Sequence, residues 1–312
     1  MESVRRAVID VGTNSVKLLV ADVAGQRVIP VLEESKQTRL GHDFYQSHVL
    51  QPEAIARTTV AVAGLAAKAR SLAPASLRVV ATSAARDAKN PGDLAAAIFA
   101  AVGLPIEIIS GDQEAEWSFQ GVTSEARFGD APLLILDVGG GSTEFILGCG
   151  PRRQFARSFP LGTLRLLDQF PPGNPPTPAG YAACHDWVTA FLCHQVRPLM
   201  EPVWHGGVLP GPVQLAGTGG TATLLGRMEL QLPHFDRAAI ESVRLSLDRL
   251  KSLCAHLWSL PLDQRREIPG LPPSRADVIL TGVVIYEAVM ETFGFQQLSL
   301  STRGLRFAAV MD

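Results

Sequence analysis

One glycine-rich hairpin pattern occurs twice in the chain. "VIDVGTNSVKLLV", residues 8–20, and "ILDVGGGSTEFIL", residues 135–147, match at a constant offset of 127 residues, so that Asp10 corresponds to Asp137. Each copy is an apolar run, an Asp-x-Gly turn and a second apolar run, which is the pattern of two strands around a tight turn. A duplicated unit of this kind predicts two similar domains.

Strands and helices alternate around the first hairpin. "LRVVATSAAR" and "IEIIS" predict strands that end at Thr82 and Ser110. Between them, "NPGDLAAAIFAAVG" predicts a helix with Asn90 as its N-cap, Pro91 at its first position and Gly103 as its C-terminal stop. "QPEAIARTTVAVAGLAAKARSLA" predicts a longer helix. This alternation indicates an α/β fold.

Length and charge narrow the class of protein. A chain of 312 residues that is 46% hydrophobic can form two cores, and we expect domains over residues 1–125 and 126–300. The net charge of −2 offers no basic excess for nucleic acid, and no apolar run approaches the length of a membrane span. The start, "MESVRRAVID", lacks the apolar stretch of a signal peptide, so we expect a cytoplasmic protein without nucleic-acid or membrane partners.

The cysteines and histidines give no metal signal. "CHDWVTAFLCH" has two Cys-His pairs nine residues apart, on a predicted helix with Thr177 as its N-cap. Nine residues are half a turn out of phase in an α-helix, so the pairs face opposite sides and metal binding is disfavoured. The His-Asp dipeptides at 42–43 and 185–186 are interpreted as incidental. We expect reduced thiols at the four cysteines, which are Cys149, Cys184, Cys193 and Cys254.

The glycine-rich turns favour phosphate binding. Such a turn directs several backbone N–H groups into one concavity that suits phosphate oxygens, and hydroxyl groups add donors. A third turn follows an apolar run in "VQLAGTGGTATLLG". Any single turn could be only a tight hairpin, but a duplicated pattern and a third loop favour phosphate. The donors expected here are Thr13, Asn14, Ser15, Gly139, Gly140, Gly141, Ser142, Thr143, Gly217, Thr218 and Gly219.

Carboxylates beside these turns indicate a divalent cation. A carboxylate near phosphate repels it unless a cation lies between them, and Mg²⁺ prefers one or two carboxylates with phosphate and water. Asp10 and Asp137 each end an apolar run, and Glu144 follows Asp137 by seven residues, where the hairpin returns it. We expect these three residues to bind Mg²⁺ or Mn²⁺. The alternative for Asp10 is a turn-forming side-chain bond.

Nine motifs, taken in order, resemble the exopolyphosphatase / guanosine pentaphosphate phosphohydrolase family. The resemblance implies an α/β fold of two ribonuclease-H-like domains, as in actin, sugar kinases and heat-shock-chaperone ATPases. It also implies an active site in the interdomain cleft and a C-terminal helix within 301–312 that packs on the first domain. The motifs are "AVIDVGTNSVKLLV", "TRLG", "ATSAARDAKN", "IISGDQEA", "LDVGGGSTEF", "SFPLGTLRL", "AGTGGTATLL", "RREIPGLPPSRADVILTG" and "STRGLR".

The same resemblance suggests roles for charged residues. Glu114, in "GDQEA", matches the catalytic glutamate of the family, which orients or deprotonates the attacking water. Arg86, in "TSAARDAKN", matches a substrate-contacting arginine, and Arg39, in "TRLG", is a second candidate for phosphate. Other interpretations stay open. Ser110 or Asp112 can cap a helix that starts here, Glu114 could only complete that cap, and either arginine could be a solvated surface charge.

The resulting hypothesis is an exopolyphosphatase that releases terminal phosphate from inorganic polyphosphate with Mg²⁺. A guanosine pentaphosphate 5′-phosphohydrolase is the alternative in the same class, and a non-catalytic phosphate or nucleotide sensor is the alternative in another. A kinase is disfavoured, because a water-activating glutamate is present and no acceptor site is evident. Longer family members carry a further helical region that helps to bind long polyphosphate. The sequence ends at Asp312, so the resemblance implies weaker retention of long chains. A homodimer is an open option.

Overall fold

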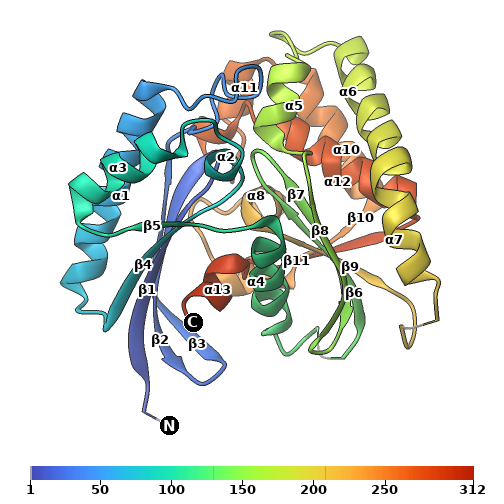
Figure 1. Ribbon diagram of the computed structural model, residues 1–312. Helices are drawn as coiled ribbons and strands as arrows, with labels where there is room; N and C mark the ends of the chain where they lie inside the picture. Colours follow the sequence, from blue (N-terminus) through green and yellow to red (C-terminus); the bar gives the residue numbers. More distant parts are fainter. Residues whose placement is uncertain (1, 129, 208) are drawn as a thin grey trace. The chain divides into compact units, whose positions relative to one another are not determined.

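Two mixed sheets organise the protein into two units. Unit 1 comprises Met1–Ser124 and Arg303–Asp312, and unit 2 comprises Glu125–Thr302. Each unit combines one sheet with its own helices, so both have the α/β architecture that the alternating pattern predicts (Figure 1). The structure is a computed structural model that describes residues 2–128, 130–207 and 209–312.

Unit 1 contains a five-stranded sheet in the order β3-β2-β1-β4-β5. The first three strands are antiparallel, and β4 and β5 continue the sheet in parallel. The strand predicted to end at Thr82 ends at Ala81, and the one predicted to end at Ser110 ends at Ile108. Charged residues and Pro30 lie on β3, as suits an edge strand. The strands are β1 (Val4–Val11), β2 (Ser15–Ala24), β3 (Arg27–Gln37), β4 (Ser76–Ala81) and β5 (Ile106–Ile108).

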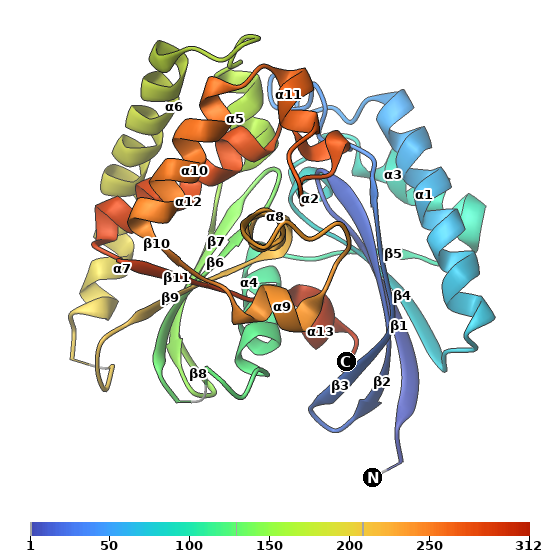
Figure 2. The same ribbon diagram turned by 180° about the vertical axis from the view of Figure 1, so that it is seen from behind.

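Helices cover both faces of the unit 1 sheet. Ile9 and Val79 face a core with α1 and α3, whereas Val8 and Val80 face a second core with α4 and α13 (Figures 1 and 2). This alternation follows from the two-residue period of a strand. The helices are α1 (Pro52–Ser71), α2 (Ser83–Arg86), α3 (Pro91–Val102), α4 (Gly111–Thr123) and α13 (Leu305–Ala309).

The ends of α3 test the predicted helix signals. Gly103 ends the helix with a φ of 69°, as predicted, because glycine tolerates the left-handed region. Asn90 occupies the N-cap position, but its side chain makes no capping bond. Instead its Oδ1 accepts from the backbone N–H of Leu50 at 2.8 Å and its Nδ2 donates to Leu50 and Asp93. Asn90 therefore holds the predicted N-cap position, but its amide bonds a neighbouring loop instead of the helix backbone.

Unit 2 contains a six-stranded sheet in the order β10-β11-β9-β6-β7-β8. β6 is its central strand, parallel to β9 and antiparallel to β7. Nearly all of its residues are buried, which explains the unbroken apolar run before Asp137. The strands are β6 (Pro132–Val138), β7 (Thr143–Cys149), β8 (Arg152–Phe159), β9 (Gln214–Thr218), β10 (Arg244–Ser246) and β11 (Gln297–Leu300).

The helix α12 is the centre of the unit 2 core. Every residue of 279–290 is buried, and the helix packs against α5, α6, α8 and α10 (Figure 2). Thr177 caps α6 by accepting from the Gly180 N–H at 3.0 Å, as predicted. The helices are α5 (Thr163–Gln169), α6 (Pro178–Phe191), η1 (Leu192–Val196), α7 (Arg197–Trp204), α8 (Gly219–Glu229), α9 (Arg237–Ser242), α10 (Leu247–Ser259), α11 (Leu262–Arg266), η2 (Pro273–Arg275) and α12 (Ile279–Phe293).

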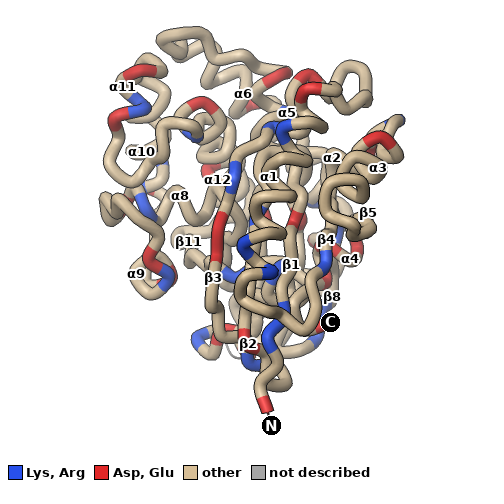
Figure 3. Tube along the Cα trace, turned by 90° about the vertical axis from the view of Figure 1, so that its left-hand side faces the viewer, with Lys and Arg blue, Asp and Glu red and all other residues tan. Residues whose placement is uncertain are grey.

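The distribution of charged residues and the state of the cysteines match what the near-neutral net charge and the cysteine spacing predict. Acidic and basic residues are interspersed along the trace, and Glu34 on β3 pairs with Lys36 at 3.0 Å and with Lys68 at 2.6 Å (Figure 3). Within the described part of the chain, no helix has both the length and the apolar character needed to cross a bilayer. All four cysteines are free, and Cys184 and Cys254 are buried.

Candidate active site

The two Asp-x-Gly hairpins have the same turn. The Gly12 N–H donates to the Ser15 carbonyl at 3.0 Å, and the Gly139 N–H donates to the Ser142 carbonyl at 2.9 Å. A Cβ atom on either glycine would lie 3.1 or 3.0 Å from the carbonyl oxygen that closes its turn. Both turns therefore depend on close backbone approach, and the duplicated hairpin predicted from the sequence is confirmed.

Strand register places a pair of carboxylates in unit 2. Asp137 on β6 lies directly opposite Glu144 on β7, so both side chains are on one face of the sheet. Glu144 is buried, and its Oε1 accepts from the Ser158 hydroxyl at 2.7 Å. In unit 1 the corresponding register pairs Asp10, also buried, with Lys17. The first hairpin thus sets a carboxylate opposite a cation, and the second sets two carboxylates together.

The loop of Gly139, Gly140 and Gly141 directs its carbonyl groups towards α5. All three carbonyl oxygens accept hydrogen bonds from the start of that helix, at 2.9 to 3.2 Å, including one from the Arg165 Nε atom. In a planar trans peptide the next N–H points the opposite way from the carbonyl. The N–H groups that follow these carbonyls therefore point away from α5, in the arrangement that suits an anion.

Two residues near this loop constrain it further. A Cβ atom on Gly162 would lie 2.5 Å from the Gly140 carbonyl oxygen, so the loop and the start of α5 are in close backbone contact. Thr143, a predicted phosphate donor, is buried and its hydroxyl donates to the Leu161 carbonyl. A hydroxyl has one hydrogen to donate. In this arrangement Thr143 braces the hairpin and has no hydrogen left for a phosphate oxygen.

The first loop is supported by the "TRLG" segment. The Thr13 carbonyl accepts from the Gly41 N–H at 2.9 Å, and the Asn14 carbonyl accepts from the N–H groups of Thr38 and Arg39 at 3.1 and 3.0 Å. By the same geometry of the trans peptide, the N–H groups after these carbonyls point away from the segment. Thr13, Asn14 and Ser15 are all buried side chains.

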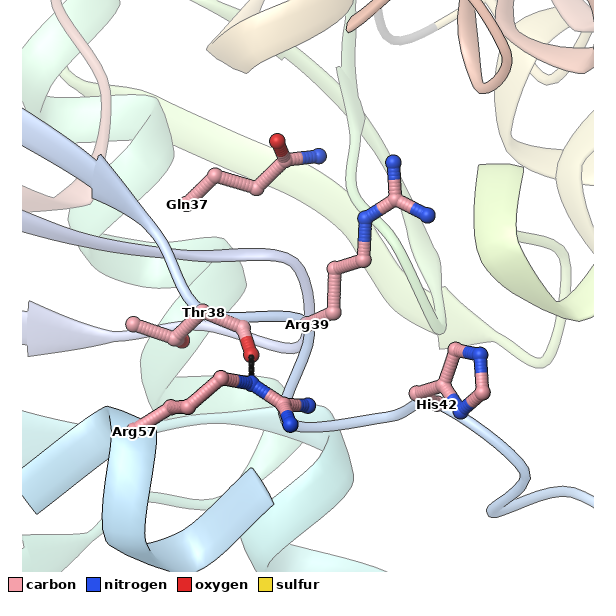
Figure 4. Close-up of a pocket in the computed structure, with 5 residues that line it drawn as sticks. All are labelled: Gln37, Thr38, Arg39, His42 and Arg57. Atoms are coloured by element: carbon pink, nitrogen blue, oxygen red, sulfur yellow. Dashed lines mark hydrogen bonds between the residues drawn. The ribbon is translucent and has the colours of Figure 1, made fainter. Parts of the chain in front are cut away.

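A pocket of about 320 Å³ adjoins this segment. Gln37 connects it to the first loop, because its Nε2 donates to the Asn14 Oδ1 at 3.2 Å. The Arg57 Nε donates to the Thr38 carbonyl at 3.3 Å, which orients one guanidinium at the pocket (Figure 4). Its described lining contains two arginines and no acidic side chain, so it favours an anion. The lining residues are Gln37, Thr38, Arg39, His42 and Arg57.

The histidine of this pocket belongs to one of the two His-Asp pairs. His42 Nδ1 lies 2.9 Å from the Asp43 Oδ2, and both side chains are exposed.

Arg39 has a φ of 49°, in the left-handed region that few residues adopt. The backbone at this position is held by the bond from the Arg39 N–H to the Asn14 carbonyl.

Glu114, which is buried, and Arg86, which is partly buried, form an ion pair in unit 1. The Arg86 Nη1 donates to Glu114 Oε2 at 2.9 Å and also to the Ile109 carbonyl at 3.2 Å. The side chains of Arg86 and Glu114 are 22% and 8% exposed. The interpretation of Arg86 as a solvated surface charge is therefore wrong. An arginine that also bonds a backbone carbonyl holds the glutamate in one orientation.

The cap of α4 separates two interpretations of Glu114. Ser110 is the N-cap, and its hydroxyl accepts from the Gln113 N–H at 3.1 Å. Of the two predicted capping residues, Ser110 holds this position, and Asp112 lies in the first turn. Because the carboxylate of Glu114 reaches Arg86, an explanation of Glu114 as part of the cap does not account for its position.

The third loop begins beside Asp137. β9 places Thr218 next to Asp137 in parallel register, and Gly219 follows with a φ of 84° at the start of α8. A Cβ atom on Gly219 would lie 2.4 Å from the Asp137 Oδ1. Thr218 makes no capping hydrogen bond to α8. Gly217 lies within β9, where a Cβ atom would meet the Tyr286 ring at 2.8 Å, so packing already explains this glycine.

Some residues at these loops were not predicted. Ser158 and Arg165 lie inside "SFPLGTLRL", a motif used only for the resemblance, and they bond Glu144 and the glycine loop. Lys17 could have been found by applying the offset of 127 residues to Glu144. Arg57 has no sequence signal, because it reaches the Thr38 carbonyl from the exposed face of α1.

Comparisons with known proteins identify the family of this chain. The model of the Ppx/GppA phosphatase family matches residues 19–311. Exopolyphosphatase 2 of Mycobacterium tuberculosis is 33% identical over 321 residues, covering 96% of each chain. The crystal structure of an exopolyphosphatase from Cytophaga hutchinsonii has a TM-score of 0.86 at 27% identity, covering 97% of this chain and 96% of that one. The Aquifex aeolicus member of the Ppx/GppA family has a TM-score of 0.79 at 26% identity, covering 99% and 97%.

These similarities extend over the full length of both units. They establish the expected fold of two α/β domains of the ribonuclease-H-like and actin-like type. They also establish the class of reaction, because the relatives are exopolyphosphatases and the family is one of phosphatases. The chain therefore belongs to the Ppx/GppA phosphatase family and is a hydrolase that acts on phosphoanhydrides.

Proposed function

We propose that the protein is an exopolyphosphatase that hydrolyses the terminal phosphoanhydride bond of inorganic polyphosphate and releases phosphate. The observation that carries the proposal is the pair of equivalent hairpin loops, each of which turns backbone N–H groups away from the segment that braces it. Each of these loops suits a phosphate group, the unit from which polyphosphate is built. The similarity to Exopolyphosphatase 2 supports this substrate class.

The pocket beside the first loop favours polyphosphate over guanosine pentaphosphate. Arg39 and Arg57 offer guanidinium groups that match phosphate oxygens. The one ring in its described lining is the imidazole of His42, which already lies against Asp43. A guanine base needs a stacking surface and donors and acceptors for its edge. The lining therefore complements a phosphate chain more closely than a nucleoside.

We assign the positioning of the attacking water to Glu114. An ionised carboxylate is a weak base, but it accepts a hydrogen bond from water and orients it for in-line attack. The hydrogen bond from Arg86 favours the ionised carboxylate and restricts its rotation. Arg86 thus acts in this proposal as a positioning residue, in addition to the substrate contact that the resemblance implies.

The carboxylates fit a divalent cation in unit 2. Asp137 and Glu144 supply two oxygen ligands from facing strand positions, which is the donor type and number that Mg²⁺ or Mn²⁺ takes beside phosphate. The ion, when bound, would neutralise charge on the phosphate oxygens. Asp10 is the corresponding candidate ligand at the first hairpin, where Lys17 opposite it makes the loop less suited to a cation.

The first test compares substrates. Phosphate release is measured with polyphosphate of several lengths, with guanosine pentaphosphate and with ATP, each with Mg²⁺ present. The proposal expects the highest kcat/KM on polyphosphate. A higher value on guanosine pentaphosphate would favour that alternative. Tight binding of polyphosphate without release of phosphate from any substrate would instead indicate a sensor.

The second test addresses Glu114. Glu114→Gln should lower kcat on polyphosphate by ~10²-fold or more and leave KM nearly unchanged, because a positioned acid–base group contributes this much. Glu116→Gln is the matched control, since Glu116 lies on the same helix and bonds Gln120 at 2.8 Å. Near-normal kcat in a folded Glu114→Gln protein would remove Glu114 from the mechanism.

A further inference from the structure

A second group of metal-type ligands lies in unit 2, between α6 and α12. His185 on α6 and Glu287 and Glu291 on α12 each place one ligand atom within 4.8 Å of the others. The His185 Nε2 lies 2.9 Å from the Glu291 Oε2. Glu287 and Glu291 are one turn apart, so they project from the same side of the helix. None of these residues belongs to the proposed active site.

Glu287 gives an independent sign that a ligand is needed. Glu287 is only 4% exposed, and its Oε2 atom has no hydrogen-bond partner among the described residues. A buried polar atom without a partner is costly, and a bound cation would relieve that cost.

We propose that His185, Glu287 and Glu291 bind a transition-metal ion, with Zn²⁺ the best match. One imidazole nitrogen with two carboxylate oxygens is a donor set that Zn²⁺ accepts, whereas Mg²⁺ is bound by oxygen ligands. Three protein ligands leave a fourth tetrahedral position. The exposure of Glu291 opens that position to water and gives the ion a route of entry.

The surroundings are compatible with this assignment. Lys251 on α10 pairs with the Glu291 Oε1 at 2.5 Å, which leaves the Oε2 facing His185. The rings of Tyr181 and His185 are 5.6 Å apart and orient the imidazole. Ligand atoms around tetrahedral Zn²⁺ are about 3.3 Å apart, for metal–ligand distances of about 2.0–2.1 Å. The three side chains would therefore move together by small rotations.

The proposed ion would fasten two helices of the unit 2 core. α12 is buried on all sides, and α6 covers it from the surface. A ligand that binds the folded state and not the unfolded state raises stability with its concentration. We therefore infer that this zinc ion is independent of the cation beside the phosphate loops and that its main effect is resistance to unfolding.

The test measures binding directly. The full-length protein is stripped with a chelator and titrated calorimetrically with Zn²⁺ and, separately, with Mg²⁺. One Zn²⁺ per chain should bind at this group, and Zn²⁺ should raise the thermal unfolding midpoint. His185→Ala and Glu291→Gln should each weaken that binding by at least ~10-fold. Both residues are partly exposed, so these variants should fold.

Two controls locate the ion. His256→Ala removes an exposed histidine on α10 and should leave Zn²⁺ binding unchanged. Asp137→Asn alters the proposed active site and should also retain this binding. If the wild-type protein bound no Zn²⁺, or if His185→Ala and Glu291→Gln bound it as the wild type does, the proposal would be wrong. Loss of the binding in Asp137→Asn with retention in His185→Ala would assign the ion to the phosphate loops instead.

Discussion

The hairpins of the two units share a turn but differ in what they place beside it. In unit 1 the strand register sets Lys17 opposite Asp10, and in unit 2 it sets Glu144 opposite Asp137. An Asp–Lys pair is close to neutral, whereas two facing carboxylates repel each other unless a cation lies between them. The same backbone therefore supports two different charge environments.

The hairpins also differ in what braces them. The first loop receives backbone N–H groups from the "TRLG" segment, and the second receives them from the start of α5. Gly41 approaches the Thr13 side chain in the first brace, and Gly162 approaches the Gly140 backbone in the second. A side chain can rotate away from a neighbour more easily than a backbone can move. We infer that the second loop is the more rigid of the two.

The largest expected effect separates the two charge environments. Asp137→Asn should raise the Mg²⁺ concentration for half-maximal polyphosphate hydrolysis by ~10–100-fold, a range typical of weakened metal sites. Lys17→Gln should leave that concentration nearly unchanged, because the first hairpin is less suited to a cation. Activity measured across a Mg²⁺ series gives both values. An equal shift in the two variants would remove the distinction between the hairpins, and full activity in excess chelator would exclude the metal.

The next effect compares the segments that support the two hairpin loops by measuring the free energy of unfolding. Gly162→Ala should cost about 3 kcal/mol of unfolding free energy, because its Cβ would meet the Gly140 carbonyl at 2.5 Å. Gly41→Ala should cost only about 1 kcal/mol, because Thr13 can yield. Urea unfolding followed by circular dichroism measures both. Gly64→Ala, at a position with open space in α1, is the control and should be neutral or slightly stabilising. Equal costs for the two glycines would contradict the inferred difference in rigidity.

The smallest expected effect concerns the pocket beside the first hairpin. Arg57→Ala should raise KM for polyphosphate by ~3- to 5-fold with kcat unchanged, because an exposed arginine contributes modestly to anion binding. Steady-state kinetics at two salt concentrations measures the change. Arg249→Ala, on α10 of unit 2 and paired with Glu229, is the matched control. A drop in kcat without a change in KM would place Arg57 outside substrate binding.

The candidate site divides into parts that the sequence could and could not predict. The hairpins, the Ser110 cap and the facing of Asp137 and Glu144 follow from spacing, because the length of the hairpin turn determines which strand positions pair. The bond between Arg86 and Glu114 joins residues 28 positions apart. Each was predicted as a separate functional residue from its motif, but no local pattern indicates that one orients the other.

Two sequence signals have a distant partner that the sequence did not reveal. Asn90 has the composition and position of a helix cap, but Leu50 takes its amide. Gly217 lies in a glycine-rich stretch, but its lack of a side chain is explained by the Tyr286 ring. In both cases the residue type matches a local sequence pattern, but a residue distant in sequence determines which contact that residue makes.

The sequence by itself determined the α/β class, the duplication, the three glycine-rich turns and the family, because these depend on local spacing and residue type. Tertiary structure alone decided which side chains meet. In the folded chain Ser158 bonds Glu144 and Arg86 bonds Glu114. His185 lies within hydrogen-bond distance of Glu291, which is 106 positions away in the sequence. The physical reason is that hydrogen bonds and charge pairs act over a few ångströms, and packing of the core decides which distant residues come within that range.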